Sequence, residues 1–438
     1  MSRTLARRAC LALAAAALAA APVRAEDPQP VIEDVLEILK ERGLVDDGQY
    51  NELVAKNRSY EEKHQNLLGR IELSGDMRLR YENFWFDDDE LGFDRSNRNR
   101  LRYRLRLQAK AQVNDYVDAV LRLASGEGDH RSTNRTLGFG EDFDPDEIFI
   151  DQAYLAFRAP EHWVPGGSLS ATGGKVPNPF LWKAAKWDAL WDADINPEGL
   201  AAQLGFAPAE NLDVFARAGY FVVDENSSNA DPHVLGVQGG LIWAVSDDLE
   251  VGARASWFSW GSLDGPFFER AADVGSLADG LTGDTGRGSD TLDVFELAGY
   301  LRFGGLHEDW PLLLYGQVAK NLDAESSDLF PTGGADEDLG WIVGLEVGDR
   351  KKLVTLGVAY ASFEANFWPA QFTESDLFDG LTNRKGWALY GSREVLPNTD
   401  LTLTLYVSDE LRDGVPGFET SLANANRVRL QTDLQVKF

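Results

Sequence analysis

The feature that most constrains this chain is the run from Asn97 to Val113, in which basic or amide residues alternate with mostly apolar ones. Successive side chains on a strand point to opposite faces, so the run predicts a strand with one apolar and one strongly basic face. Such a basic face suits either bulk water on a one-sided sheet or the water-filled interior of a membrane barrel. For one strand the one-sided sheet is the commoner case, so repetition of the pattern decides. The even positions are Arg98, Arg100, Arg102, Arg104, Arg106, Gln108, Lys110 and Gln112.

Residues 1–25 predict a secretory signal peptide, with three arginines at the start, an alanine- and leucine-rich stretch over 11–21 and the cleavage-like end Val23-Arg24-Ala25. The chain's one cysteine, Cys10, lies in this segment, so we expect neither thiol chemistry nor a disulfide in the mature protein. Removing the four arginines of the segment changes the formal net charge from −29 to −33, which disfavours nucleic acid as a partner. No later apolar run reaches the roughly 18 residues of a membrane helix. Export then leads to the periplasm, the medium or a barrel in the outer membrane.

Residues 26–68 predict a periplasmic helical hairpin. Val35 and Ile38 belong to a helical spacing that ends at Gly43, and Asp46 or Asp47 is suited to cap a second helix. A periplasmic plug or spacer is the plainer interpretation of this hairpin. A short coiled coil that joins subunits is the alternative, although Gly43 interrupts its heptads.

Residues 69–438 predict a transmembrane antiparallel β-barrel, because the period of two recurs in segment after segment. In the first of these segments the apolar residues Leu73, Met77 and Leu79 oppose Arg78 and Arg80. The fold class is therefore all-β, with a short helical segment before the barrel. Sixteen strands are predicted, near 71–81, 97–113, 117–123, 149–158, 167–175, 199–207, 211–222, 234–245, 249–259, 292–303, 312–320, 339–348, 353–362, 385–393, 400–408 and 426–438.

The connections between these segments alternate strictly between short and long. An even number of strands with both ends on the short-turn side is the pattern of an outer-membrane barrel, with periplasmic turns and extracellular loops. Aromatic residues at outward positions near both ends of the strands indicate the two membrane interfaces. They are Tyr81, Tyr220, Trp257, Trp341, Tyr360 and Trp387 near the long loops, and Phe157, Trp243, Phe303 and Phe438 near the short turns.

The last strand alternates up to Phe438, and this resembles the assembly signal that the barrel-assembly machinery reads in outer-membrane barrels. Nearly the whole mature chain resembles a porin family of Gram-negative outer-membrane β-barrels, and more distantly the sixteen-stranded general porins. The resemblance implies a passive diffusion channel, with a homotrimer as the default assembly. It rests on the segments 35–44 (VLEILKERGL), 151–155 (DQAYL), 173–180 (GGKVPNPF), 190–192 (LWD) and 196–200 (NPEGL).

Closing the barrel would pair the last strand with the first and gather ten arginines into one surface, here named the basic wall. Its members are Arg78, Arg80, Arg98, Arg100, Arg102, Arg104, Arg106, Arg122, Arg427 and Arg429. General porins place acids of an inward-folded third loop across the pore from such a cluster. In this chain the third long loop, 176–198, supplies Asp188, Asp192, Asp194 and Glu198. We hypothesise that the two surfaces form a charged constriction. In the alternative, the arginines only balance inward acids such as Asp76 and Asp118, and the loop lies over the rim.

Other chemistries receive little support from the sequence. The acid clusters 87–90 and 141–147 lack the spacing of a dedicated calcium loop, so lipopolysaccharide-facing loops explain them better than a metal site. No triad, metal cluster or phosphate-binding loop is present, so we expect no enzyme and no cofactor. A soluble β-sandwich that binds or adheres is disfavoured by outward faces rich in Leu, Val and Trp.

The sequence thus predicts an outer-membrane porin that passes small hydrophilic solutes and ions and contacts lipid and lipopolysaccharide. Two alternatives remain open. One is a channel selective for an anion such as phosphate or a carboxylate, in which the arginines act as a ladder. The other is a structural envelope barrel with a closed pore.

Overall fold

The computed structural model describes residues 38–40, 42, 44–65, 70–87, 98–138, 145–182, 184–225, 227, 230–262, 292–307, 309–324, 336–413 and 426–438. The predicted signal peptide, most of the first predicted helix and the larger part of both acid clusters lie outside these ranges. In the part of the chain that is described, no helix is long and apolar enough to cross a membrane.

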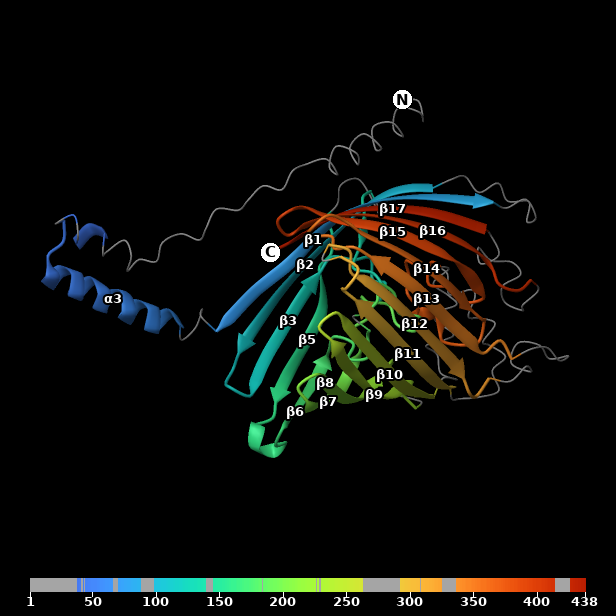
Figure 1. The fold of residues 1–438 in the computed structure, drawn as a ribbon, viewed down its shortest axis with the longest axis horizontal. Coiled ribbons are helices and arrows are strands. Elements are labelled where there is room, and N and C mark those ends of the chain that lie inside the picture. Colours follow the sequence, from blue (N-terminus) through green and yellow to red (C-terminus); the bar gives the residue numbers. More distant parts are fainter. Residues whose placement is uncertain are drawn as a thin grey trace, which may run out of the picture.

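Sixteen long antiparallel strands form one sheet, as the alternation in the sequence predicted (Figure 1). A further strand of two residues, β4, adds onto β2. The strands are β1 (Ile71–Asp87), β2 (Arg98–Gln112), β3 (Val117–Ala124), β4 (Arg135–Thr136), β5 (Phe149–Arg158), β6 (Gly167–Lys175), β7 (Glu198–Ala209), β8 (Leu212–Val222), β9 (His233–Ser246), β10 (Leu249–Gly261), β11 (Leu292–Phe303), β12 (Leu312–Asn321), β13 (Leu339–Val347), β14 (Thr355–Phe363), β15 (Arg384–Leu396), β16 (Thr399–Glu410) and β17 (Asn426–Lys437).

The sheet closes into a barrel because β1 pairs with β17 on one side and with β2 on the other. Each other long strand pairs with its neighbours in sequence, with β3 joined directly to β5. Closure leaves the sheet without an exposed edge, as a lipid environment demands.

The two faces of the strands are segregated as in a membrane barrel rather than as in a soluble protein. On β2, Leu101 and Leu107 are 52% and 45% exposed on the outside, whereas Arg102 and Arg104 are 8% and 5% exposed on the inside. This reverses the usual rule that apolar side chains are buried and charged ones exposed. The outer surface therefore suits lipid.

Aromatic residues predicted for the outer surface near the long loops contact one another across three strands. The Tyr360 ring on β14 lies 5.6 Å from that of Trp341 on β13 and 4.8 Å from that of Trp387 on β15, between ring centroids. A row of this kind is typical of a membrane interface, where one edge of each ring meets water.

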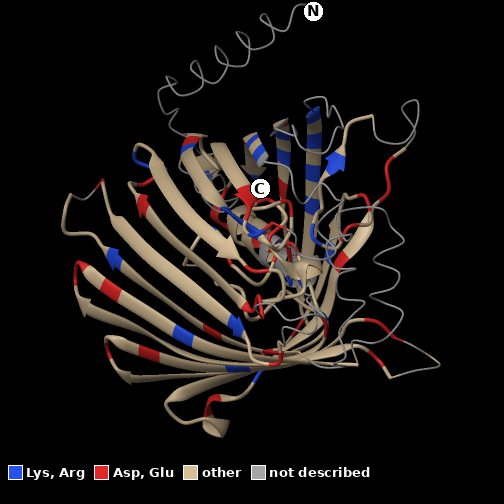
Figure 2. Cartoon of the chain, turned by 90° about the vertical axis from the view of Figure 1, so that its right-hand side faces the viewer, with Lys and Arg blue, Asp and Glu red and all other residues tan. Residues whose placement is uncertain are grey.

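Among the described residues, two long connections fold into the barrel. They are the third loop, which the structure bounds at 176–197, and the seventh loop, 364–383. Trp191 of the third loop and Trp368 of the seventh pack in one apolar cluster with Phe258 and Trp260, which point inward from β10. Figure 2 looks into the barrel from the side of the long connections and shows chain within the ring of strands.

The helix α3 (Asp47–Gln65) precedes the barrel and corresponds to the second predicted helix. Asp46 begins it with a capping box, because Gln49 N donates to Asp46 Oδ1 over 2.8 Å and Asp46 N donates to Gln49 Oε1 over 3.1 Å. The hairpin itself stays a prediction.

The seam between the two chain ends depends on Gly75 of β1. Gly75 and Phe438 exchange two backbone hydrogen bonds of 2.8 and 3.0 Å. A Cβ at residue 75 would lie 2.6 Å from the carbonyl oxygen of Arg106 and 2.7 Å from the Phe438 ring. Glycine is thus required here by close packing, not by an unusual backbone angle.

We therefore expect Gly75→Val to lower the temperature at which the folded barrel loses its fast gel mobility, by about 5 °C or more. Gly316→Val is the matched control, because a Cβ there meets its nearest neighbour at an ordinary 3.5 Å. Equal losses in both variants would show that the seam is not specially sensitive.

Candidate functional site

The register of β17, β1 and β2 places nine of the ten residues of the basic wall on adjacent strands. Arg78 lies opposite Arg104, and Arg80 opposite Arg102, across the β1–β2 pair. On the other side of β1, the residues opposite Arg427 and Arg429 are Phe86 and Phe84. Figure 2 shows the basic residues gathered on neighbouring strands on one side of the barrel. Arg98, Arg100 and Arg106 continue the row along β2, and Arg122 lies on β3.

Acids on the strands themselves neutralise part of the wall. Asp76 accepts from Arg104 over 2.8 Å and from Arg106 over 2.7 Å, and Arg100 and Arg429 both contact Glu82. Asp118 instead pairs with Arg158 and Lys110, and Arg122 with Asp151. The predicted alternative, in which inward acids balance the arginines, therefore holds for Asp76 but not for Asp118.

The four predicted acids of the third loop each contact different partners. Asp194 lies 3.3 Å from Arg106 and 3.8 Å from Arg104, measured from oxygen to nitrogen, so it faces the wall. Asp188 pairs with Arg254 of β10 over 2.9 Å. Asp192 accepts a hydrogen bond from the backbone N of Ser375 over 2.7 Å. Glu198 is the first residue of β7 and pairs with Lys175 of the adjacent strand.

The seventh loop supplies two of the three inner-loop acids that pair with the wall in the described residues, and the sequence prediction missed this. Asp376 pairs with Arg80 over 2.8 Å and with Arg429 over 3.0 Å, and Asp379 pairs with Arg427 and Arg429. The apolar content of the loop could have indicated this, because a loop that lies in water rarely carries so many large apolar side chains. The residues concerned are Phe367, Trp368, Phe372, Leu377, Phe378 and Leu381.

The third and seventh loops are fastened to each other. Besides the contact between Asp192 and Ser375, Asp192 N donates to the carbonyl oxygen of Phe372 over 2.8 Å. The Trp191 and Trp368 rings meet edge to face with centroids 5.1 Å apart. Together the loops form one internal structure set between the basic wall and β10.

Residues 92–272 match the family model described as "Putative porin". The resemblance expected from the sequence is thereby confirmed over that stretch. No match is found among curated proteins.

Three solved structures show how the fold compares. OprB of Pseudomonas putida covers 86% of this chain and 97% of its own, with a TM-score of 0.52 and 12% identity. The outer membrane channel DcaP of Acinetobacter baumannii covers 84% and 97%, with a TM-score of 0.45 and 13% identity. A triple mutant of Rhodopseudomonas blastica porin covers 84% and 100%, with a TM-score of 0.41 and 9% identity. The likeness to OprB shows a shared fold, and with the porin match it favours a channel over an enzyme.

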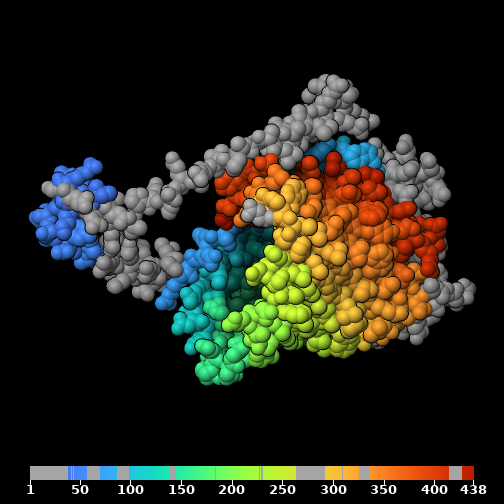
Figure 3. Space-filling view, in the orientation of Figure 1, coloured from blue at the N-terminus to red at the C-terminus, as the bar shows by residue number. Residues whose placement is uncertain are grey.

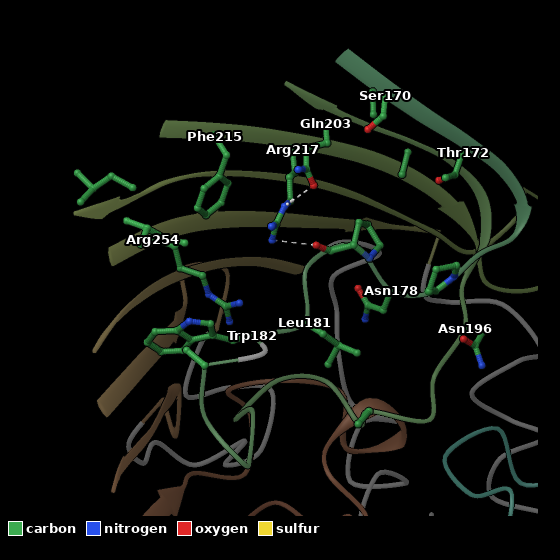
Figure 4. Close-up of a pocket in the computed structure, with 18 of the residues that line it drawn as sticks. Ser170, Thr172, Asn178, Leu181, Trp182, Asn196, Gln203, Phe215, Arg217 and Arg254 are labelled. Carbon is green, nitrogen blue, oxygen red and sulfur yellow. Dashed lines mark hydrogen bonds between the residues drawn. The ribbon is translucent and has the colours of Figure 1, made fainter. Parts of the chain in front are cut away.

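Two cavities lie on opposite sides of the third loop. One of about 220 Å³ lies between the basic wall and the two inner loops. Another of about 740 Å³ lies between the third loop and strands β5–β11 (Figure 4). Figure 3 shows the molecule hollowed between its teal and its yellow-green strands. Among the described residues, no group of three or more His, Cys, Asp or Glu is placed to hold a metal ion.

Charges of both signs line the smaller cavity in equal number. Its acids are Asp192, Asp194, Glu374, Asp376 and Asp433, and its bases are Arg78, Arg80, Arg104, Arg131 and Lys186. Arg78 donates to Asn134 Oδ1 over 2.7 Å. No carboxylate of the described residues lies within ion-pair distance of the Arg78 guanidinium.

The pKa values of the acids on the two inner loops shift in opposite directions beside this cavity. Burial raises the pKa of Asp192 to about 7, with a further rise from the charge of Asp194. Burial also raises the pKa of Glu374 well above its ordinary value. The pKa of Asp376 falls well below its ordinary value, because Arg80 and Arg429 outweigh the effect of burial. At neutral pH the wall therefore holds ionised acids, while Asp192 titrates.

The stability of the barrel should depend on pH through Asp192. Its folded pKa lies above its ordinary value of 3.8, so its contribution is lost as the pH rises from about 4 through about 7. We expect the thermal unfolding temperature of Asp192→Asn relative to the wild type to be higher at pH 8 than at pH 5.

Asp194→Asn is the control for this pH test, because Arg104 and Arg106 lower the pKa of Asp194 despite its burial. That variant should be less stable than the wild type at both pH values. A difference between Asp192→Asn and the wild type that is the same at pH 5 and pH 8 would contradict the assignment.

Proposed function

We propose that this protein is an outer-membrane porin through which small hydrophilic solutes and ions diffuse at a charged constriction. The observation that carries the proposal is the closed barrel with an apolar exterior, whose basic wall faces the acids of two inner loops. The match of residues 92–272 to a porin family model supports it. Lipid, lipopolysaccharide, a homotrimer and export by a signal peptide belong to the same proposal.

The mechanism follows from where the charges lie. Basic and acidic side chains border one narrow cavity, so a solute that crosses it must exchange part of its hydration for contacts with fixed charges. Small polar molecules and ions can make that exchange, whereas apolar molecules gain nothing from it. The residues act by position and charge, without covalent chemistry.

Single-channel conductance of the purified protein in a planar bilayer, with the reversal potential under a KCl gradient, tests the proposal. Large ohmic steps with a cation-leaning potential are expected, because the wall is largely neutralised and the chain without its signal peptide has a formal net charge of −33. The absence of any step would overturn the proposal in favour of a structural envelope barrel.

An anion-selective channel is the second candidate, and Arg78 is the observation that favours it. This guanidinium faces the smaller cavity, and its hydrogen-bond partner among the described residues is the amide oxygen of Asn134. Small, saturating, anion-selective steps in the same experiment would decide for this candidate. Permeation would then run along the arginines as a ladder.

A further inference from the structure

The larger cavity contains one arginine whose charge the protein leaves uncompensated. Four arginines line the cavity, and three of them have carboxylate partners. Arg122 pairs with Asp151, Arg302 with Glu250 over 2.7 Å, and Arg254 with Asp188 and Glu296 over 2.9 and 2.6 Å. The fourth is Arg217 of β8. No carboxylate of the described residues lies within ion-pair distance of its guanidinium.

Neutral acceptors hold Arg217 in one orientation. Its Nε donates to Gln203 Oε1 over 3.0 Å, and its Nη1 donates to Gln238 Oε1 over 2.9 Å and to the carbonyl oxygen of Pro179 over 3.1 Å (Figure 4). Its Nη2 makes no hydrogen bond to any of the described residues. A guanidinium fixed by neutral groups keeps its full charge and a free donor for a ligand, so the fork is organised before anything binds.

Part of the cavity wall beside Arg217 is apolar. The Phe215 ring lies 4.4 Å from the Arg217 guanidinium, measured to the ring centroid. Leu181 and Trp182 of the third loop border the same cavity, with Trp182 4.9 Å from the guanidinium of Arg254 (Figure 4). The cavity, at about 740 Å³, is large enough for a small organic molecule.

We propose that this cavity binds an organic anion with a single carboxylate on an apolar body. The carboxylate would accept from Arg217, and the body would lie against Leu181, Trp182 and Phe215. Inorganic phosphate fits less well, because it would meet the guanidinium but leave the apolar walls in contact with water. The proposal deepens the proposed function and rests on it, since the cavity lies inside the barrel between the third loop and the strands.

Titration calorimetry of the intact protein in detergent tests this site, with sodium benzoate, benzyl alcohol and sodium phosphate as probes. Benzoate should bind saturably, and both benzyl alcohol and phosphate should bind at least about ten-fold more weakly. Arg217→Gln should weaken benzoate binding about ten-fold or more. Phosphate binding as tight as that of benzoate would overturn the apolar part of the proposal.

Arg302→Gln is the matched control, because Arg302 lines the same cavity but is paired and 47% exposed. It should leave benzoate affinity within about two-fold of the wild type. Unchanged benzoate affinity in Arg217→Gln would overturn the site. If Arg217→Gln fails to fold, Trp182→Ala serves instead, and its benzoate affinity should also fall.

The same proteins in planar bilayers separate this inference from the proposed function. Benzoate should reduce the current through the wild type in a saturable way, and this block should be lost in Arg217→Gln. Benzoate binding without conductance would refute the channel and keep the site. Conductance without benzoate binding would refute the site and keep the channel.

Discussion

Replacing residues 365–382 of the seventh loop by an Asn-Gly turn is expected to raise the single-channel conductance by about two-fold or more, because the loop occupies the interior beside the basic wall. The replacement is geometrically feasible, since Phe363 and Arg384 are directly paired across β14 and β15. The channel should also become more anion-selective. Asp376 and Asp379 are lost, which leaves Arg427 and Arg429 with fewer carboxylate partners.

The double variant Asp376→Asn and Asp379→Asn separates charge from volume in this experiment. It keeps the length and the rings of the loop, so we expect the anion preference to rise with little change in conductance. The thermal unfolding temperature should fall in both variants, because buried arginines lose partners. If the shortened protein conducts like the wild type, the seventh loop does not obstruct the pore.

The strands could be predicted from the sequence because each long strand pairs with the long strands before and after it along the chain. A period of two fixes which side chains face lipid, and a shift of one residue in register would exchange the two faces. The arginines of β2 and the leucines between them therefore determined both the strand and its orientation. Consecutive pairing and closure then placed Arg427 and Arg429 beside β1 without further information.

The paths of the loops could not be predicted in the same way, because they depend on partners distant in sequence. Asp192 contacts Phe372 and Ser375 of a connection some 180 residues away, a separation that no periodic pattern reports. Four acids of the third loop were expected to face the basic wall. Among the ion pairs of the described residues, Asp194 is the one of these four that pairs with it. Attention to apolar residues in long connections, such as Trp368 and Phe378, would have found the seventh loop.

The composition of the larger cavity illustrates a further limit. Arg217 on β8 and Arg254 on β10 both occupy inward positions of alternating strands, with β9 between them, and nothing local distinguishes them. Only the fold shows that Asp188 of the third loop and Glu296 of β11 reach Arg254, whereas Gln203 and Gln238 flank Arg217. Whether a basic residue is neutralised is therefore a property of the tertiary structure, although it decides what the residue can bind.

Replacing both Arg102 and Arg104 by Ala is expected to shift the reversal potential toward cation selectivity, with a change of about two-fold or more in the permeability ratio. Both side chains lie on the interior face of β2 at less than a tenth exposure, and Arg104 pairs with Asp76 over 2.8 Å. Their removal leaves Asp76, Glu82 and Asp194 with less positive charge nearby, so the local potential becomes more negative. The measurement is the reversal potential under a KCl gradient, at low and at high ionic strength.

The expected shift should shrink as ionic strength rises, because mobile ions screen the fixed charges over about 10 Å at 0.1 M salt. Arg158→Ala is the matched control, since Arg158 pairs with Asp118 at the end of β5 and is 48% exposed. It should leave the reversal potential nearly unchanged. If the double variant has the conductance and the selectivity of the wild type, the basic wall does not border the path of the ions, and the constriction must be sought at the larger cavity beneath the third loop.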